Sequence, residues 1–129
     1  MITKKTILLL ILFCLTNLDG KAQEIPNWLI QEWSYLTTGT GIWETDNSEY
    51  KKESEPFEKY RLVWTYGLGK KSIEGKLYGI KEGENIETFW KFRTFWHPVE
   101  KKAFTEQFGG DGTYGIGELF VEDGAVIKM

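Results

Sequence analysis

Two segments of this chain place large apolar side chains at every second position, and this period of two constrains the fold more than any other feature. In YRLVWTY, residues 60–66, the residues on one face are Tyr60, Leu62, Trp64 and Tyr66. In IETFWKFRTFW, residues 86–96, they are Ile86, Trp90, Phe92 and Trp96, and the residues between them, including Phe89, fall on the other face. Successive side chains of a β-strand point to opposite faces of a sheet. Both segments therefore predict strands.

Turn sequences separate these segments from further strand-like runs at 33–45, 72–81, 102–108, 113–122 and 125–129. The breaks read GLGKK (67–71), KEGEN (81–85), HPVEKK (97–102), GGDG (109–112) and EDG (122–124). Glycine allows the positive φ that tight hairpins need, and Pro98 lacks the N–H that strand pairing uses. Strands joined by short hairpins predict an all-β, antiparallel up-and-down meander.

Only the start of this domain has a helical pattern. Pro26 suits the first position of a helix, and WLIQEW at 28–33 gives a turn or two an apolar side. The chain after residue 33 offers no long amphipathic helix, which argues against folds in which a sheet wraps around one. We therefore expect a short N-terminal helix followed by strands.

The number of predicted strands bears on how the edges of the sheet are covered. Long hairpin-linked strands usually avoid open edges by closing into a barrel, and small ligand-holding barrels use about eight strands. This chain supplies seven such runs, and the last, AVIKM, ends without a polar tail. One interpretation is a shortened chain whose barrel is incomplete at the C-terminus. In the other, residues 124–129 pair with the first strand (33–45) of the same chain or with a partner chain.

The first 22 residues have the pattern of a cleavable signal peptide. Lys4 and Lys5 form a basic start, residues 7–15 are apolar, and Gly20 and Ala22 supply small residues before a cleavage site at Gln23. A membrane-spanning helix needs about 20 apolar residues, so this run is too short to remain as an anchor. We expect an exported protein, periplasmic or extracellular, with residues 23–129 as its single domain.

Charge and cysteine content exclude several classes of function. The chain has a net charge of −3, and removal of the basic first segment makes the rest more acidic still. An acidic chain without a basic stripe is a poor nucleic-acid binder. Cys14, the only cysteine, lies in the signal segment, so the mature domain has no disulfide, thiolate nucleophile or cysteine zinc site.

The order of these elements resembles the lipocalin-like (calycin) barrels, in particular small secreted bacterial proteins of that kind. The resemblance covers residues 27–129 and includes a G-x-W triplet at Gly41-Ile42-Trp43. A second tryptophan, Trp33, lies where the helix meets the first predicted strand, with Gln31 in place of the glycine. The resemblance implies that one of these tryptophans plugs the base of the barrel, and we favour Trp33. It also implies an apolar cavity for a small lipophilic molecule, without catalysis.

His97, the only histidine, is the residue whose type best suits catalysis or haem ligation. As a general base it would act with Arg93 or Glu106, on a barrel scaffold. The alternative is a polar residue that ends a strand before Pro98. No second histidine or cysteine of the mature domain accompanies it, so we expect no metal site and no cofactor.

Aromatic residues are more numerous than a small core requires. Each buried ring removes about 150–250 Å² from water, and the chain has 6 Trp, 6 Tyr and 8 Phe, so a handful would be enough. Either the barrel interior simply needs large side chains, or the excess lines a cavity. We expect the cavity to be lined by Trp64, Tyr66, Trp90, Phe92 and Trp96. Arg93 or His97 would hold a polar group near its mouth.

These observations favour a binding module for a small hydrophobic or amphipathic ligand, monomeric or homodimeric. A barrel-scaffold enzyme and a ligand-free accessory domain with a filled core remain as alternatives. The same alternation of side chains also predicts that Trp64, Trp90 and Trp96 are largely buried.

Overall fold

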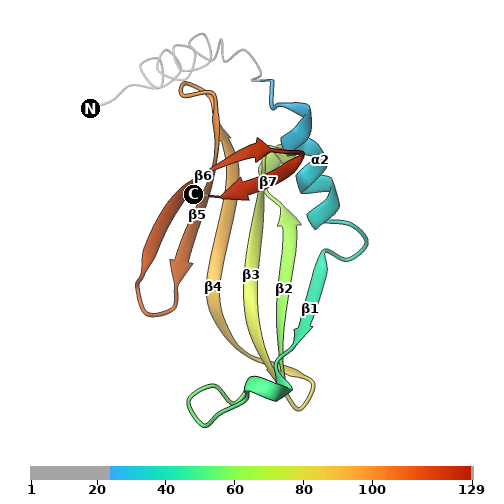
Figure 1. Ribbon diagram of the computed structural model, residues 1–129, viewed down its shortest axis with the longest axis vertical. Coiled ribbons are helices and arrows are strands. Elements are labelled where there is room, and N and C mark those ends of the chain that lie inside the picture. Colours follow the sequence, from blue (N-terminus) through green and yellow to red (C-terminus); the bar gives the residue numbers. More distant parts are fainter. Residues whose placement is uncertain (1–23, 129) are drawn as a thin grey trace, which may run out of the picture.

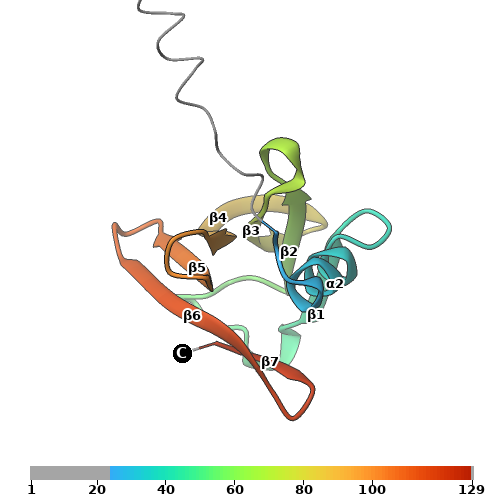
Figure 2. The same ribbon diagram turned by 90° about the horizontal axis from the view of Figure 1, so that it is seen from above.

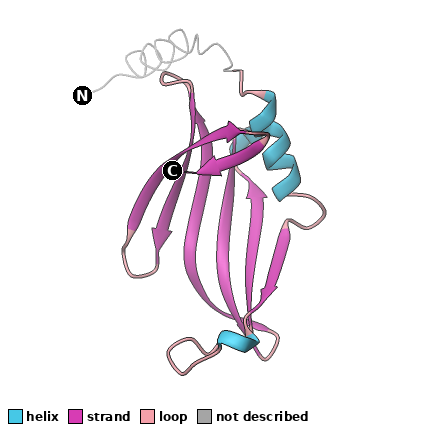
Figure 3. Ribbon diagram, in the orientation of Figure 1, coloured by secondary structure: helices cyan, strands magenta, loops and turns pink. Residues whose placement is uncertain are grey.

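The computed structural model describes residues 24–128, which form a single antiparallel sheet preceded by a helix (Figures 1 and 3). The elements are α2 (Asn27–Leu36), β1 (Ile42–Asp46), β2 (Lys59–Tyr66), β3 (Ser72–Lys81), β4 (Glu84–His97), β5 (Lys102–Gly109), β6 (Tyr114–Glu122) and β7 (Ala125–Lys128). Short 3-10 turns, η1 (Ser48–Tyr50) and η2 (Leu68–Lys70), lie in two of the connections. The predicted signal segment lies outside the described residues. No helix within 24–128 is long and apolar enough to cross a membrane.

The strands follow one another in the sheet in the order β1-β2-β3-β4-β5-β6-β7, and each pair is antiparallel. This confirms the predicted up-and-down meander. Seen from above, the strands lie on an arc that curls through more than half of a ring (Figure 2). In the described residues β7 pairs with β6 and not with β1, so the sheet is a half-barrel that does not close within this chain.

The predicted first strand at 33–45 is wrong in its first part. Residues 33–36 belong to α2, and strand pairing begins only at Ile42. The reason is packing: Leu29 and Trp33 are one helical turn apart, and both are buried, with exposed fractions of 0% and 1%. A helix over 27–36 places both residues on the side that packs against Ile73 and Ala103 of the sheet.

Gly41 makes the connection between α2 and β1 possible. Its φ is +68°, and a Cβ at this position would lie 2.2 Å from the carbonyl oxygen of Trp64 on the neighbouring strand. Glycine alone suits both the left-handed conformation and the close approach. The glycine of the G-x-W triplet thus has a backbone role, and Trp43 follows it on β1.

The two faces of the curved sheet differ in what they contact. Ile73 and Ala103, from two different strands, form the core together with Leu29 and Trp33 of α2. Because α2 packs on this face and the sheet curls around it, we call it the concave face. Outside the irregular stretch of β4 before Trp90, cross-strand pairing places every second residue of β2, β3, β4, β5 and β6 on this face. The other, convex face is directed outward.

The concave face has two ends, which we name by what lies over them. At the helix end α2 covers the sheet, and the residues buried there include Leu29, Trp33, Ile73 and Ala103. At the loop end, the lower end in Figure 1, the connection 47–58 between β1 and β2 lies across the strands. Phe57 from this connection is 5% exposed, and its ring occupies the space that a side chain at Gly79 would fill.

Candidate functional site

The concave face contains two hollows, one at each end. The hollow at the helix end has a volume of about 250 Å³ and the one at the loop end about 390 Å³. Both are open to solvent and lined mainly by apolar side chains. Small-molecule sites in proteins commonly occupy about 300–1,000 Å³, so each hollow is of the size of a small ligand or part of one.

The helix-end hollow lies between α2 and five strands. Its lining residues are Glu32, Trp33 and Leu36 from α2, Leu62 and Trp64 from β2, Phe92 and Thr94 from β4, Thr105 from β5, Leu119 from β6 and Val126 from β7. The helix and the last hairpin thus approach each other across the opening of the half-barrel. Sheet strands far apart in sequence contribute to one concavity because the sheet curls.

Polar groups in this hollow differ in how well they are satisfied. The hydroxyls of Thr94 and Thr105, both buried, lie 2.5 Å apart and form a hydrogen bond with each other. The indole nitrogens of Trp33 and Trp64 are buried and have no acceptor in the described part of the chain. By contrast, the indole N–H of Trp43 donates to the carbonyl of Leu36 at 2.8 Å.

The loop-end hollow has an aromatic floor and a polar rim. The floor is formed by Phe57, Tyr60, Leu77, Phe89 and Trp90, and the rim by Lys52, Ser54 and Glu55. The ring of Phe89 packs edge-on against Phe57 at 4.9 Å between centroids and against Tyr60 at 5.9 Å. Three rings in mutual contact make a firm apolar surface under an open space.

A β-bulge explains why Phe89 and Trp90 both contribute to this hollow. Leu77 pairs with Trp90 and Tyr78 pairs with Thr88, so Phe89 is an extra residue on β4. An extra residue interrupts the strict alternation of sides. The assignment of Phe89 to the face opposite Trp90 is therefore wrong, because that assignment assumed an unbroken period of two.

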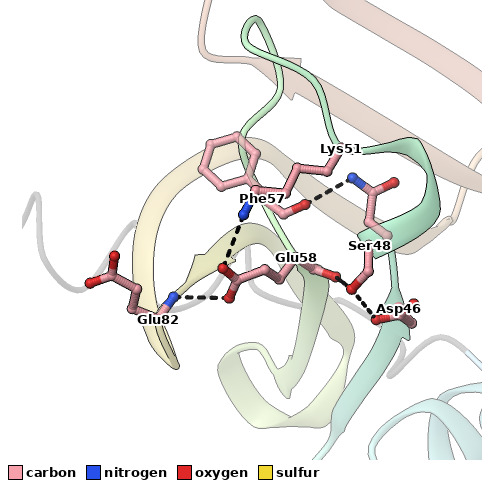
Figure 4. A network of polar contacts seen from close by, with 7 residues as sticks. Asp46, Ser48, Lys51, Phe57, Glu58 and Glu82 are labelled. Atoms are coloured by element: carbon pink, nitrogen blue, oxygen red, sulfur yellow. Dashed lines mark hydrogen bonds and ion pairs between the residues drawn. The ribbon is translucent and has the colours of Figure 1, made fainter.

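A network of polar contacts fastens the 47–58 connection to the neighbouring hairpin (Figure 4). One carboxylate oxygen of Glu58 accepts a hydrogen bond from the backbone N–H of Glu82 at 3.0 Å, and the other accepts one from Lys51 Nζ at 3.2 Å. Ser48 donates to Asp46 at 2.8 Å. The hydrogen bond from the Glu82 backbone and, after it, the contact with Lys51 hold the pKa of the Glu58 carboxyl below its ordinary value of 4.5.

Tyr60 joins the floor of the loop-end hollow to its rim. Its hydroxyl forms a hydrogen bond with the carboxylate of Glu55, which also lies 3.7 Å from the ammonium of Lys52. Burial and the negative charge of Glu55 raise the pKa of Tyr60 to about 12. The phenol thus stays protonated at neutral pH and acts as a donor on the rim.

The structure brings together five of the predicted site residues and separates two. Cross-strand pairing places Trp64, Tyr66, Trp90, Phe92 and Trp96 on the concave face. All are partly exposed, and Tyr66 most of them at 37%. Trp64, Trp90 and Trp96 each have most of their surface covered but are not fully buried, which agrees with the prediction that they are largely buried. Trp96 packs against the core beside α2, and Trp90 borders the loop-end hollow.

Arg93 and His97 lie on the convex face, away from both hollows. The guanidinium of Arg93 donates to the carboxylate of Glu106 at 2.7 Å, directly across the β4–β5 pair. His97 Nδ1 accepts a hydrogen bond from the backbone N–H of Glu100 in the turn after β4, and its ring packs edge-on against Phe104. These contacts place neither side chain at the mouth of a concave hollow.

Several lining residues escaped sequence reasoning. Leu62 and Thr94 share the period-two face with the predicted set, so the alternation already pointed to them. Glu32, Leu36 and Val126 reach the hollow only because α2 and the last hairpin fold across its opening, and no local pattern reports that.

Within residues 24–128, no cluster of three or more His, Cys, Asp or Glu side chains is arranged to hold a metal ion. Comparisons with protein-family models, with characterised proteins and with solved structures find no match to this chain.

Proposed function

We propose that this chain is an exported binding module that holds a small hydrophobic or amphipathic molecule on the concave face of its half-barrel. The observation that carries the proposal is the pair of hollows at the two ends of that face, lined mainly by buried and partly exposed aromatic and aliphatic side chains. Concave apolar surfaces with a few polar groups are the usual form of small-molecule sites. Export with cleavage before Gln23 belongs to the same proposal, and N-terminal sequencing of the secreted protein checks it.

The distribution of polarity supports an amphipathic ligand. The helix-end hollow is mostly apolar, and the loop-end hollow has Lys52, Ser54 and Glu55 on its rim. Leu62, Trp90 and Phe92 lie on the same face between the two ends. A ligand could thus bury its apolar part beneath α2 and leave its polar part near the loop.

The proposal is tested by filling the helix-end hollow from its edge. Val126 lines that hollow from β7, so Val126→Trp adds a large side chain into the space. Val121 is the residue paired with Val126 on β6, is 44% exposed and does not line the hollow, so Val121→Trp is the matched control. The probe is a fluorescent naphthalene sulfonate dye, titrated into the protein and displaced by apolar competitors.

We expect saturable dye binding by the wild type and by Val121→Trp, and binding at least about tenfold weaker in Val126→Trp. Circular dichroism and thermal unfolding establish that each variant is folded. The proposal fails if the wild type binds no apolar probe saturably, or if both variants weaken binding equally.

A further inference from the structure

The connection between β5 and β6, residues 110–113, borders a further open space next to the loop-end hollow. This space has a volume of about 260 Å³, and its lining residues are Phe89, Trp90, Gly109, Gly110 and Asp111. Phe89 and Trp90 also line the loop-end hollow, so the two spaces meet at these rings. We call the further space the turn hollow.

The glycine-rich sequence of this connection brings a carboxylate next to an aromatic ring. A Cβ at Gly109 would lie 2.6 Å from Oδ1 of Asp111 and 3.2 Å from the ring of Trp90. Glycine leaves room for both groups, because they converge on the space that a side chain would take. The GGDG sequence, which predicts a turn, thus also places Asp111 beside Trp90.

Of the described residues that line the turn hollow, Asp111 alone is charged. It is exposed, and no lysine, arginine or histidine side chain among residues 24–128 forms an ion pair with it. The backbone N–H of Thr113 donates to its Oδ1 at 2.9 Å and holds the pKa of this carboxyl below its ordinary value of 3.8. The carboxylate is therefore ionised at neutral pH and reachable from solvent.

Two lysines at this end of the sheet lie outside the turn hollow. Lys91 follows Trp90 on β4, and alternation along the strand places its side chain on the convex face. Lys52 lies on the rim of the loop-end hollow, where its ammonium is 3.7 Å from the carboxylate of Glu55. The turn hollow thus combines aromatic rings with one negative charge that no lysine offsets.

This combination favours an organic cation as the ligand. An ammonium group over an aromatic ring is attracted by the negative face of the ring, most strongly for tryptophan, and a nearby carboxylate adds direct charge attraction. We propose that the turn hollow takes an organic ammonium group, held between Trp90 and Asp111, with the apolar part of the same molecule in the loop-end hollow. This inference rests on the proposed function and specifies the charged group of its amphipathic ligand.

The test compares choline with 3,3-dimethylbutan-1-ol, which has the same shape and a carbon atom in place of the charged nitrogen. We expect choline to bind about tenfold more tightly, because only the cation gains from the ring and the carboxylate. Titrations followed by nuclear magnetic resonance of nitrogen-15-labelled protein measure both affinities. The amide signals of Trp90, Gly109 and Gly110 should move saturably with choline.

Two variants assign the effect. Asp111→Asn keeps the shape of the side chain and removes its charge, so it should bind choline at least about fivefold more weakly. Asp123→Asn is the matched control, because Asp123 is an exposed aspartate in the β6–β7 turn and its replacement changes the net charge equally. This control should bind choline as the wild type does. Thermal unfolding establishes that both variants are folded.

Three results would overturn the ammonium inference. They are failure of choline to bind more tightly than the alcohol, equal weakening of choline binding by both variants, and choline shifts centred on Glu55 and Tyr60 without shifts at Gly109 and Gly110. Each leaves the proposed function standing, because saturable binding of the naphthalene sulfonate dye tests that function separately.

Discussion

The two ends of the concave face are built from the same strands and differ in what covers them. At the helix end Leu29 and Trp33 are buried against Ile73 and Ala103, with exposed fractions of 0% to 1%. At the loop end Tyr60, Phe89 and Trp90 remain partly exposed around an open hollow. One end of the sheet has a packed core, and the other has a lined surface.

This difference shows that alternation along the strands does not by itself produce a core. β2, β3 and β4 run through both ends, and most of their residues on the concave face are apolar. Among the described apolar residues, exposed fractions of 0% to 1% occur only where α2 supplies the opposing layer, whereas Phe57 and Ile80 at the loop end keep 5% and 3%. The loop connection 47–58 covers the other end with few apolar residues, and Phe57 is the buried one.

The largest expected effect is on the free energy of unfolding, when a tryptophan is replaced by alanine at each end of the concave face. Trp33→Ala removes a ring from the packed core and should lower the free energy of unfolding by about 3–5 kcal/mol. Trp90→Ala removes a partly exposed ring at the loop-end hollow and should cost about 1–2 kcal/mol. Urea denaturation followed by circular dichroism measures both. Equal losses would mean that Trp90 belongs to a core as tight as that under α2.

A glycine substitution tests whether the loop end has a firm floor. A Cβ at Gly79 would lie 2.4 Å from the ring of Phe57, so Gly79→Ala should displace that ring and cost about 1–3 kcal/mol. Gly115 on β6 has no atom within 4 Å of such a Cβ, and Gly115→Ala should stay within about 0.5 kcal/mol of the wild type. A neutral Gly79→Ala would show that Phe57 does not rest on the sheet.

The smallest expected effect concerns the polar network at the loop end. Because its contacts lower the pKa of Glu58 in the folded protein, this carboxylate stabilises the fold at pH values above its unfolded pKa. That stabilisation is lost as the pH falls through the lowered folded value. Glu58→Gln should therefore be less stable than the wild type at about pH 6, and the difference should shrink as the pH falls below the ordinary pKa of 4.5.

Thermal unfolding of both proteins across this range measures the effect. The control is Glu49→Gln, at an exposed residue for which the described residues provide no ion pair. A difference between wild type and Glu58→Gln that stayed constant with pH would exclude a titrating Glu58 as its cause.

The strands could be predicted from the sequence, but the irregular parts of the fold could not. The runs at 72–81, 102–108 and 113–122 coincide with β3, β5 and β6 to within one residue at either end, because glycine turns and period-two patterning are local signals. The helical course of residues 33–36 and the bulge at Phe89 were missed, since both depend on contacts with distant residues. Local periodicity does not report them.

For the candidate site, the sequence predicted which aromatic residues share a face but not where the charged residues lie. Trp64, Trp90 and Phe92 lie on one face, as their spacing required. Arg93 and His97 occupy alternate positions on β4 with Phe92 and Trp96, so the same spacing places them on the opposite face. Arg93 and His97 were assigned to the mouth of the cavity because of their residue types, although the alternation along the strand already placed them on the opposite face.

An amide chemical-shift map recorded while the naphthalene sulfonate dye is titrated into nitrogen-15-labelled protein tests most directly whether the concave face is the binding surface. We predict saturable shifts at Leu62, Trp64, Phe92 and Leu119, around the helix-end hollow. The strands carry the convex residues Phe104, Phe108 and Ile116 on their other side, and amide signals near these side chains should move much less. Saturable shifts centred on Phe108 and Ile116, or no saturable shift anywhere, would contradict a ligand site on the concave face.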